Sequence, residues 1–470
     1  MTYDWPLPKI VGLTAVIVWA VAVALTPSTT GRLALLGTGL AVGLFWWLSC
    51  GADRWLTAFF ATAILLPPLP FALGNSGPHI APLFAAAGIL VFLLSIDRAR
   101  LRGGRLLLFL LLFMGALLES IIFAALLSGP DVALLSLFRI LLVAIAPFIL
   151  LYVLTRQTIS VRRSIGGARL LFRFAVAAAA FACADFYFQF PSPVGYSAQF
   201  VWLENTVLRR AQGLFYEAST LGNFCAFFLV LMLIAFFSRR EIRFCSRIEL
   251  GLGGSILAAA LIFSYSRGSL LNLLCAACAF FCLRRFSGKR FVLVTIGGAI
   301  VIAALVYVLF PSFSESYWLR LGISVRYLPS EPGAVLSGRL SSWITLAQFL
   351  IQNPSRLLFG IGYKTLPYSS YVGAAVIADN TYLDLLVETG LLGLCSFLAL
   401  NVEMLRRSFR AARSPDVLPK FFGTWFFCFW IGELVQMVSG DLITYWRVLP
   451  IFFWTLGVAI ISSSENSITN

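Results

Sequence analysis

Three polar stretches hold the residues of this chain that are best suited to do chemistry. They are LRRAQGLFYEASTLG at residues 208–222, SYSRGS at residues 264–269, and the long segment from Ser337 to Asn380. Each stretch contains at least one arginine, and two of them contain a carboxylate. Guanidinium groups bind the oxygens of anionic ligands bidentately, and carboxylates orient or deprotonate hydroxyl groups. The stretches therefore favour a site for an anionic ligand.

The rest of the chain is apolar enough to predict a membrane protein. Of its 470 residues, 60% are hydrophobic and 12% are charged, which excludes an ordinary soluble domain. Apolar runs of about 18 or more residues recur along the whole length, so the sequence predicts an all-α, polytopic integral membrane protein with about 14 transmembrane helices. The first is expected to be a membrane helix rather than a cleavable signal peptide. The expected helices lie near residues 9–26, 31–50, 55–73, 79–96, 105–128, 132–154, 170–190, 212–238, 249–266, 268–283, 291–310, 379–402, 420–439 and 441–463.

Basic residues are distributed unevenly between the two sides that these helices define. Every second loop is rich in arginine and lysine, and together those loops hold 24 of the 35 basic residues. The positive-inside rule places these loops in the cytoplasm and predicts that both termini are cytoplasmic. The net charge of +15 is thus mostly a topology signal, and we expect no nucleic-acid partner.

The other 11 basic residues are expected on the outer face, where the same rule predicts few. Two of them, Arg139 and Arg447, are predicted to lie about two turns inside helices, where an arginine without a partner costs about 2.5 kcal/mol or more. Such a concentration of charge suggests an anionic ligand. The alternative is pairing with carboxylates of the same side. These carboxylates include Glu119, Asp131, Asp185, Glu217 and Asp441.

Helix ends are expected to position the first two polar stretches. The stretch 208–222 is predicted to open the helix near 212–238, which places Arg210 and Glu217, seven residues apart, on one helix face. SYSRGS is predicted to form a tight turn that presents Arg267 to the outside. A hydrated hairpin turn without any ligand is the alternative for this second stretch.

The long segment is predicted to combine a surface helix, a turn and the start of a membrane helix. Apolar residues recur at helical spacing between Arg339 and Asn353, which predicts an amphipathic helix on the outer surface. The glycines of residues 359–362 predict a turn with an accessible backbone. Asp379 stands where the next helix begins, so it suits a simple N-cap as well as a ligand contact.

Metal ligands are sparse in this sequence. Cys275, Cys278 and Cys282 share one helix face, but no histidine or carboxylate stands beside them, so packing is the favoured interpretation. The single histidine, His79, excludes a histidine-based metal site. Few carboxylates are expected to cluster on the outer side. We therefore expect neither a bound metal nor a cofactor.

The order of the polar motifs resembles the O-antigen polymerase and ligase superfamily, which comprises Wzy-type polysaccharide polymerases and O-antigen ligases. RAQGLFYEASTLG, SYSRGS, SGRLSSW…NPSRLLFGIG and DNTYLDLLVETGLLGL follow one another in the family's order, over about residues 200–405. The resemblance implies a glycosyltransferase C-type fold in a bacterial inner membrane, with sugars linked to undecaprenyl pyrophosphate as substrates. The expected parts are N-terminal transmembrane helices (1–190), transmembrane helices with the outer-face Arg and Glu motifs (191–310), one large periplasmic loop (311–378) and C-terminal transmembrane helices (379–470).

The same resemblance assigns roles by position. It places the family's outward arginines on Arg210, Arg267 and Arg339, which would bind the pyrophosphate. The family's His-Asn-x-Tyr-Leu motif falls on residues 379–383, where Asp379 replaces the histidine that has been assigned a catalytic role in ligases. This replacement favours a polymerase. The catalytic candidates are Asp379 and Glu217, and the expected substrate contacts are Asn380, Tyr382, Tyr216, Arg447, Arg139 and Tyr363.

The resulting hypothesis is a metal-independent membrane glycosyltransferase that polymerises O-antigen or exopolysaccharide repeat units. It would transfer a growing glycan from undecaprenyl pyrophosphate to a lipid-linked repeat unit at the periplasmic face. The first alternative is an O-antigen ligase-type enzyme that acts on lipid A core or protein. A flippase for the same lipid-linked oligosaccharide is the second, and it predicts an internal repeat that the sequence lacks. The expected partners are the lipid-linked oligosaccharide, membrane lipid, a chain-length regulator and a flippase.

The predicted topology can be tested with reporter fusions. Because the basic loops are expected in the cytoplasm and residues 311–378 outside, fusions at Ser414 and Gly333 should report opposite sides of the membrane. Equal signals from a reporter that is active on one side only would contradict the shared outer face of the arginines.

Overall fold

The computed structural model describes residues 53–69, 78–94, 104–155, 160–192, 196–202, 207–238, 244–284, 339–368 and 378–464, together with isolated positions outside these ranges. Most of the described residues are helical. Three predicted helices, near 9–26, 31–50 and 291–310, lie outside the described ranges.

Six helices in the described part of the chain are long and apolar enough to cross a membrane, and shorter apolar helices accompany them. This confirms the prediction of a predominantly helical, multi-pass membrane protein. The six are α5 (Arg105–Ser128), α6 (Pro130–Leu154), α7 (Val161–Phe188), α8 (Ala218–Phe237), α16 (Thr381–Ala412) and α17 (Val417–Gln436), which a 3₁₀ turn extends to Ser439. The shorter apolar helices are α3 (Arg54–Leu65), α4 (Ala81–Leu94), α10 (Arg267–Leu283) and α18 (Leu449–Ser464). A further helix, α9 (Arg247–Phe263), lies between α8 and α10 in the chain.

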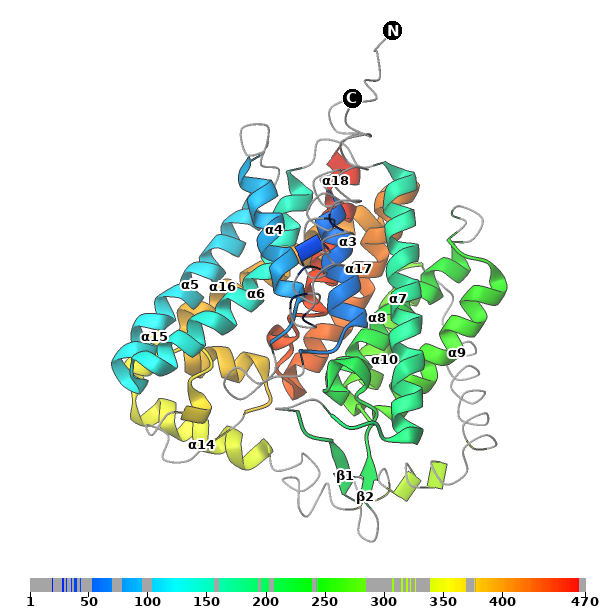
Figure 1. Cartoon of the computed structure of the whole chain (residues 1–470). Helices are drawn as coiled ribbons and strands as arrows, with labels where there is room; N and C mark the ends of the chain where they lie inside the picture. Colours follow the sequence, from blue (N-terminus) through cyan, green and yellow to red (C-terminus); the bar gives the residue numbers. More distant parts are fainter. Residues whose placement is uncertain are drawn as a thin grey trace.

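Elements near the polar stretches lie together at one end of the helix bundle, at the bottom of Figure 1. Strands β1 (Phe200–Trp202) and β2 (Val207–Arg209) form a short antiparallel pair there, which the sequence did not predict. Helix α14 (Arg339–Gln352) lies at the same end and has the predicted bounds. A further short helix, α15 (Pro354–Phe359), follows it because proline suits the first turn of a helix.

Aromatic side chains fill the centre of the bundle around α8. The Phe227 ring lies with its centroid 4.4 Å from those of Trp425 on α17 and Phe452 on α18. The indole of Trp425 donates a hydrogen bond of 2.9 Å to the Phe227 carbonyl, so this polar group does not remain unsatisfied in an apolar interior. Helices α8 and α17 are the most buried of the six long helices.

Helix α16 is broken at Gly390, which the prediction of one continuous helix near 379–402 did not anticipate. Gly390 has φ 67° and ψ −169°, a backbone conformation that is essentially restricted to glycine. The break interrupts the hydrogen bonds that the carbonyls of the preceding turn would accept from the next turn. Those carbonyls are consequently open to partners from elsewhere in the chain.

The loop after α15 supplies these partners. The backbone N–H of Ile361 donates to the Val387 carbonyl at 3.1 Å, and that of Gly362 donates to the Glu388 carbonyl at 2.9 Å. A Cβ at Gly390 would meet the backbone of Leu358 and Phe359, at the end of α15. Two segments far apart in sequence thus dock through their backbones.

The predicted helix near 441–463 begins later than expected, and two 3₁₀ turns precede it after α17. These are η5 (Met437–Ser439) and η6 (Leu442–Thr444), and α18 begins only at Leu449, next to Pro450. The first residue of α16 holds this segment: the Thr381 hydroxyl donates to the Gly440 carbonyl at 2.7 Å and accepts from the Leu442 N–H at 3.1 Å. Residues 437–448 therefore serve as a wall beside the start of α16.

The docking of the loop on α16 predicts a large effect of Gly390→Ala. The new Cβ would impose a strained φ and contact the Leu358 carbonyl, so we expect the free energy of unfolding to fall by about 1–3 kcal/mol. Denaturant unfolding of the purified protein measures this. Gly251→Ala is the matched control, because a Cβ on this α9 glycine meets no described atom within 4 Å. Equal stability of both variants would contradict the role of Gly390.

Candidate functional site

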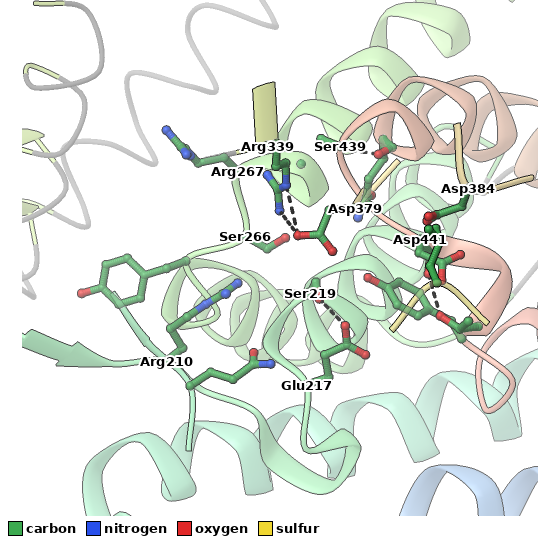
Figure 2. Close-up of a pocket in the computed structure, with 18 of the residues that line it drawn as sticks. Arg210, Glu217, Ser219, Ser266, Arg267, Arg339, Asp379, Asp384, Ser439 and Asp441 are labelled. Atoms are coloured by element: carbon green, nitrogen blue, oxygen red, sulfur yellow. Dashed lines mark hydrogen bonds and ion pairs between the residues drawn. The ribbon is translucent and has the colours of Figure 1, made fainter. Parts of the chain in front are cut away.

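A cavity of about 590 Å³ opens at the end of the bundle where the polar stretches meet. Its wall is built by the end of the β1–β2 pair, the starts of α8, α10, α14 and α16, the loop after α15, and residues 436–445. Figure 2 shows that side chains from these separate segments converge on one space. The charged residues that line it are Arg210, Glu217, Arg267, Arg339, Lys364, Asp379, Asp384, Glu388 and Asp441.

All three predicted pyrophosphate-binding arginines and both predicted catalytic carboxylates are in this set. The expectation that few carboxylates cluster here is wrong, since five line the cavity. Three of these five, Asp384, Glu388 and Asp441, were not proposed as site residues. In the described part of the chain, no group of three or more histidine, cysteine or acidic side chains has an arrangement that could hold a metal ion.

Arg339 and Asp379 form an ion pair at the mouth of the cavity. The Asp379 Oδ2 atom lies 3.1 Å from Arg339 Nη2 and 3.2 Å from Nε, and both side chains are partly exposed. Helix α14 is held in place by Trp343, whose indole N–H donates to the Ala378 carbonyl at 2.7 Å. The first residue of α14 is thereby fixed against the segment that leads into α16.

Asn380, not Asp379, caps α16. The Asn380 Oδ1 atom accepts hydrogen bonds from the N–H groups of Tyr382 and Leu383 at 3.0 and 3.1 Å. Asp379 precedes this cap with φ 45°, which directs its carboxylate to Arg339 instead. The N-cap alternative for Asp379 is therefore wrong by one residue.

Arg210 and Glu217 do not share a helix face, because the helix begins only at Ala218. A 3₁₀ turn (Gly213–Phe215) and Tyr216, with φ 55°, separate them. Both side chains nevertheless line the cavity. The Arg210 Nε–H donates to the Ser264 carbonyl at 2.8 Å, which fixes this arginine against the turn before α10. Burial lowers the pKa of Arg210, although the neighbouring Tyr445 and Glu217 oppose this shift.

Glu217 is the N-terminal flanking residue of α8 and is held by its own helix. Its two carboxylate oxygens accept hydrogen bonds from the hydroxyls of Ser219 at 2.8 Å and Thr220 at 2.7 Å. Burial raises the pKa of Glu217, and these two hydrogen bonds only partly oppose the shift. A raised pKa makes a carboxylate a better general base near neutral pH.

Lys364 is the centre of a second charged cluster in the same cavity. Its ammonium nitrogen contacts Asp441 and lies 3.8 Å from Glu388 Oε2 and 3.9 Å from Asp384 Oδ2. Burial alone would lower the pKa of Lys364, but the three carboxylates raise it well above its usual value. Sequence reasoning missed this cluster. The spacing of Asp384 and Glu388, four residues apart on one helix face, was the signal that could have indicated part of it.

Backbone strain is concentrated around the cavity. Among the described residues, five non-glycine residues have positive φ, and three of them, Tyr265, Lys364 and Asp379, line the cavity. A fourth, Tyr216, precedes Glu217. Such conformations cost about 1–3 kcal/mol each and cluster at functional sites. The fold thus maintains strain to direct these side chains.

Arg447 was predicted to lie inside a helix, and this is wrong. It precedes α18 and donates to the carbonyls of Ala63 at 2.7 Å, Leu66 at 2.9 Å and Leu214. The bonds to Ala63 and Leu66 satisfy the end of α3, and the third bond joins it to the 3₁₀ turn Gly213–Phe215. Burial lowers the pKa of Arg447 to about 10. The backbone carbonyls make an additional anionic ligand unnecessary for this arginine.

Arg139 does lie inside a helix, α6, and it contacts the loop after α15 that forms part of the cavity wall. Its guanidinium donates to the Lys364 carbonyl at 3.0 Å and to the Tyr368 hydroxyl at 3.3 Å. Tyr363 is almost fully buried next to it, while the Tyr382 hydroxyl donates a hydrogen bond to the Leu434 carbonyl at 2.8 Å.

Six predicted substrate contacts are absent from the described residues that line the cavity. They are Arg139, Tyr216, Tyr363, Asn380, Tyr382 and Arg447.

The fold and the cavity define a multi-pass membrane protein with a densely charged site at one end of its helices. Residues 252–398 match the family model described as O-antigen ligase (Wzy_C). This match confirms the resemblance to the O-antigen polymerase and ligase superfamily. The matched range includes Arg267, Arg339 and Asp379, whereas Arg210 and Glu217 precede it. No curated protein matches the chain.

Two neighbouring substitutions test the distinction between cap and ion pair. Asn380→Ala should lower the free energy of unfolding by about 1 kcal/mol because it removes the α16 cap. Asp379→Asn should change it less, since partly exposed ion pairs contribute about 0–1 kcal/mol and asparagine tolerates positive φ. Denaturant unfolding measures both, with Asn380→Asp as the control that retains a cap. A larger loss for Asp379→Asn would contradict the assignment.

Proposed function

We propose that the protein is a polysaccharide polymerase of the O-antigen or exopolysaccharide type. It transfers a growing glycan from undecaprenyl pyrophosphate to a lipid-linked repeat unit at the periplasmic face of the bacterial inner membrane. The observation that carries this proposal is the convergence of Arg210, Arg267 and Arg339 on one cavity beside two carboxylates, in a chain whose family match points to glycan transfer.

The arginines act on the leaving group. A pyrophosphate carries several negative charges, which planar guanidinium groups bind through paired N–H donors. As the bond between the sugar C1 atom and the phosphate oxygen breaks, its electron pair goes to the pyrophosphate. Fixed positive charge stabilises this developing anion. The arginines supply that charge, so the proposed reaction uses no metal ion.

The carboxylates act on the acceptor. Its hydroxyl oxygen attacks C1, and the hydroxyl proton goes to a carboxylate of the cavity. Glu217 suits this role because burial raises its pKa and because its oxygens already accept from hydroxyl donors. Asp379 is held by Arg339, so we assign it to positioning of the pyrophosphate arginine and the acceptor.

A ligase is the second candidate, and the description of the matching family favours it. The polymerase is preferred because Asp379 occupies the position of the ligase histidine. Purified protein supplied with a single lipid-linked repeat unit should form lipid-pyrophosphate-linked polymer without any other acceptor. Transfer that requires lipid A core would make the protein a ligase.

The arginine site predicts a shared phenotype for three variants. Arg210→Ala, Arg267→Ala and Arg339→Ala should each reduce polymer formation at least a hundredfold, and lysine at the same positions should restore little because it lacks the paired donors. Gel analysis of the glycan product measures this, together with a folding check by size-exclusion chromatography. Arg173→Ala is the matched control, since Arg173 is an exposed arginine paired with Glu249 outside the cavity. Normal polymer from any cavity variant would remove that residue from the site.

A further inference from the structure

The cavity has two halves of different charge. Arg210, Arg267 and Arg339, with Glu217 and Asp379 beside them, form the arginine half. Lys364, Asp384, Glu388 and Asp441 form the carboxylate half. Figure 2 shows the labelled arginines on one side of the space and Asp384 and Asp441 on the other. Each half contains its own ion pairs: Arg339 pairs with Asp379, and Lys364 pairs with the three other carboxylates.

The carboxylate half is unsuited to a pyrophosphate. One ammonium group faces three carboxylates, so the half has an excess of negative charge when these groups are ionised. Like charges at close range in a partly buried site repel each other strongly, because water screens them less than in bulk solution. Ionised carboxylates accept hydrogen bonds and donate none. The half therefore suits a neutral ligand that carries many hydroxyl donors.

One acceptor in this half has no donor. The Glu388 side chain is 1% exposed and lines the cavity, yet its Oε2 atom accepts no hydrogen bond from any residue that the structure describes. Lys364 lies 3.8 Å away, beyond hydrogen-bonding distance. A buried acceptor without a donor carries the cost of lost hydration with no hydrogen bond to offset it. A ligand hydroxyl that reaches this oxygen would recover that cost.

The surrounding backbone holds the half in place before any ligand binds. The Gly362 N–H donates a hydrogen bond to the Glu388 carbonyl at 2.9 Å, and the Arg139 guanidinium donates one to the Lys364 carbonyl at 3.0 Å. The hydroxyl of Ser136 donates to the Tyr363 carbonyl at 2.6 Å. Lys364 itself has φ 57°. Preorganised polar groups of this kind are typical of binding sites.

We propose that the carboxylate half binds the acceptor sugar through its hydroxyl groups, with Glu388 as a direct contact and Lys364 as a positioning residue for the three carboxylates. This inference rests on the proposed glycan transfer. It also predicts specificity: a neutral sugar ring should be accepted, and a ring that carries a carboxylate should be rejected because it would face Asp384, Glu388 and Asp441.

The test separates acceptor binding from donor binding. The probe is a short-chain alkyl glycoside of the neutral repeat unit, which has no pyrophosphate, added to purified protein in lipid nanodiscs without glycoside detergent. Glu388→Gln and Asp441→Asn should raise the acceptor KM at least tenfold and leave the KM of the lipid-linked donor within twofold. Arg339→Ala should show the reverse pattern, a loss of donor use. Thermal unfolding identifies any variant that fails to fold. Because Asp441 is partly exposed, Asp441→Asn is less prone to misfolding than Glu388→Gln.

Calorimetric binding of the alkyl glycoside provides a readout that needs no transfer. Wild-type protein should bind it, and Glu388→Gln should bind it at least tenfold more weakly. An unchanged acceptor KM and unchanged calorimetric binding in both folded variants would overturn the inference. Wild-type protein that binds the glycoside but transfers nothing from the lipid pyrophosphate would contradict the proposed function instead. A uronic acid glycoside that binds as tightly as the neutral one would also overturn the inference.

Discussion

The backbone contact between the loop after α15 and the broken helix α16 is the constraint on which the rest of the cavity depends. The break at Gly390 leaves the carbonyls of Val387 and Glu388 without partners in their own helix. The N–H groups of Ile361 and Gly362 donate hydrogen bonds to these two carbonyls. Gly360 and Gly390 both have φ near 70° and approach the opposite segment so closely that a Cβ on either would meet backbone. Irregular backbone is tolerated among membrane helices where protein buries it or where it lines a cavity. The docked loop carries Lys364, whose ammonium lies beside two carboxylates of α16, Asp384 and Glu388.

Polar side chains elsewhere in the bundle have the different task of joining helices. The amide groups of Asn223 on α8 and Asn272 on α10 both donate to Glu433 and Gln436 on α17. Gln436 also lines the cavity, so this buried network links the cavity wall to three helices. Hydrogen bonds between membrane helices contribute about 0.6–2 kcal/mol each. The same principle explains Arg447, which is satisfied by carbonyls and thus belongs to the scaffold.

Sequence patterns predicted those features that depend on neighbours in the chain. Apolar run length indicated a multi-pass helical protein, helical spacing gave the bounds of α14, and the SYSRGS turn separates α9 from α10 as expected. Features set by distant segments were not predictable in this way. The break at Gly390 depends on a loop about 30 residues earlier, and an arginine that binds carbonyls looks the same in sequence as one that faces a cavity. Arg139 and Arg447 were therefore grouped with Arg210 and Arg339, from which only packing distinguishes them.

If Asp379 occupies the position of the ligase histidine, as the resemblance implies, the proposed reaction must handle its proton differently. A neutral imidazole can accept a proton from a hydroxyl near neutral pH. The Asp379 carboxylate has one oxygen in contact with two nitrogens of Arg339, so this oxygen is already committed to the pair. Glu217, in contrast, accepts hydrogen bonds from the hydroxyls of Ser219 and Thr220, and burial raises its pKa. Proton transfer therefore suits Glu217 better, while the Arg339–Asp379 pair keeps a guanidinium at the mouth of the cavity. In the proposed reaction the aspartate thus positions a phosphate-binding arginine instead of acting as a weaker substitute for a histidine base.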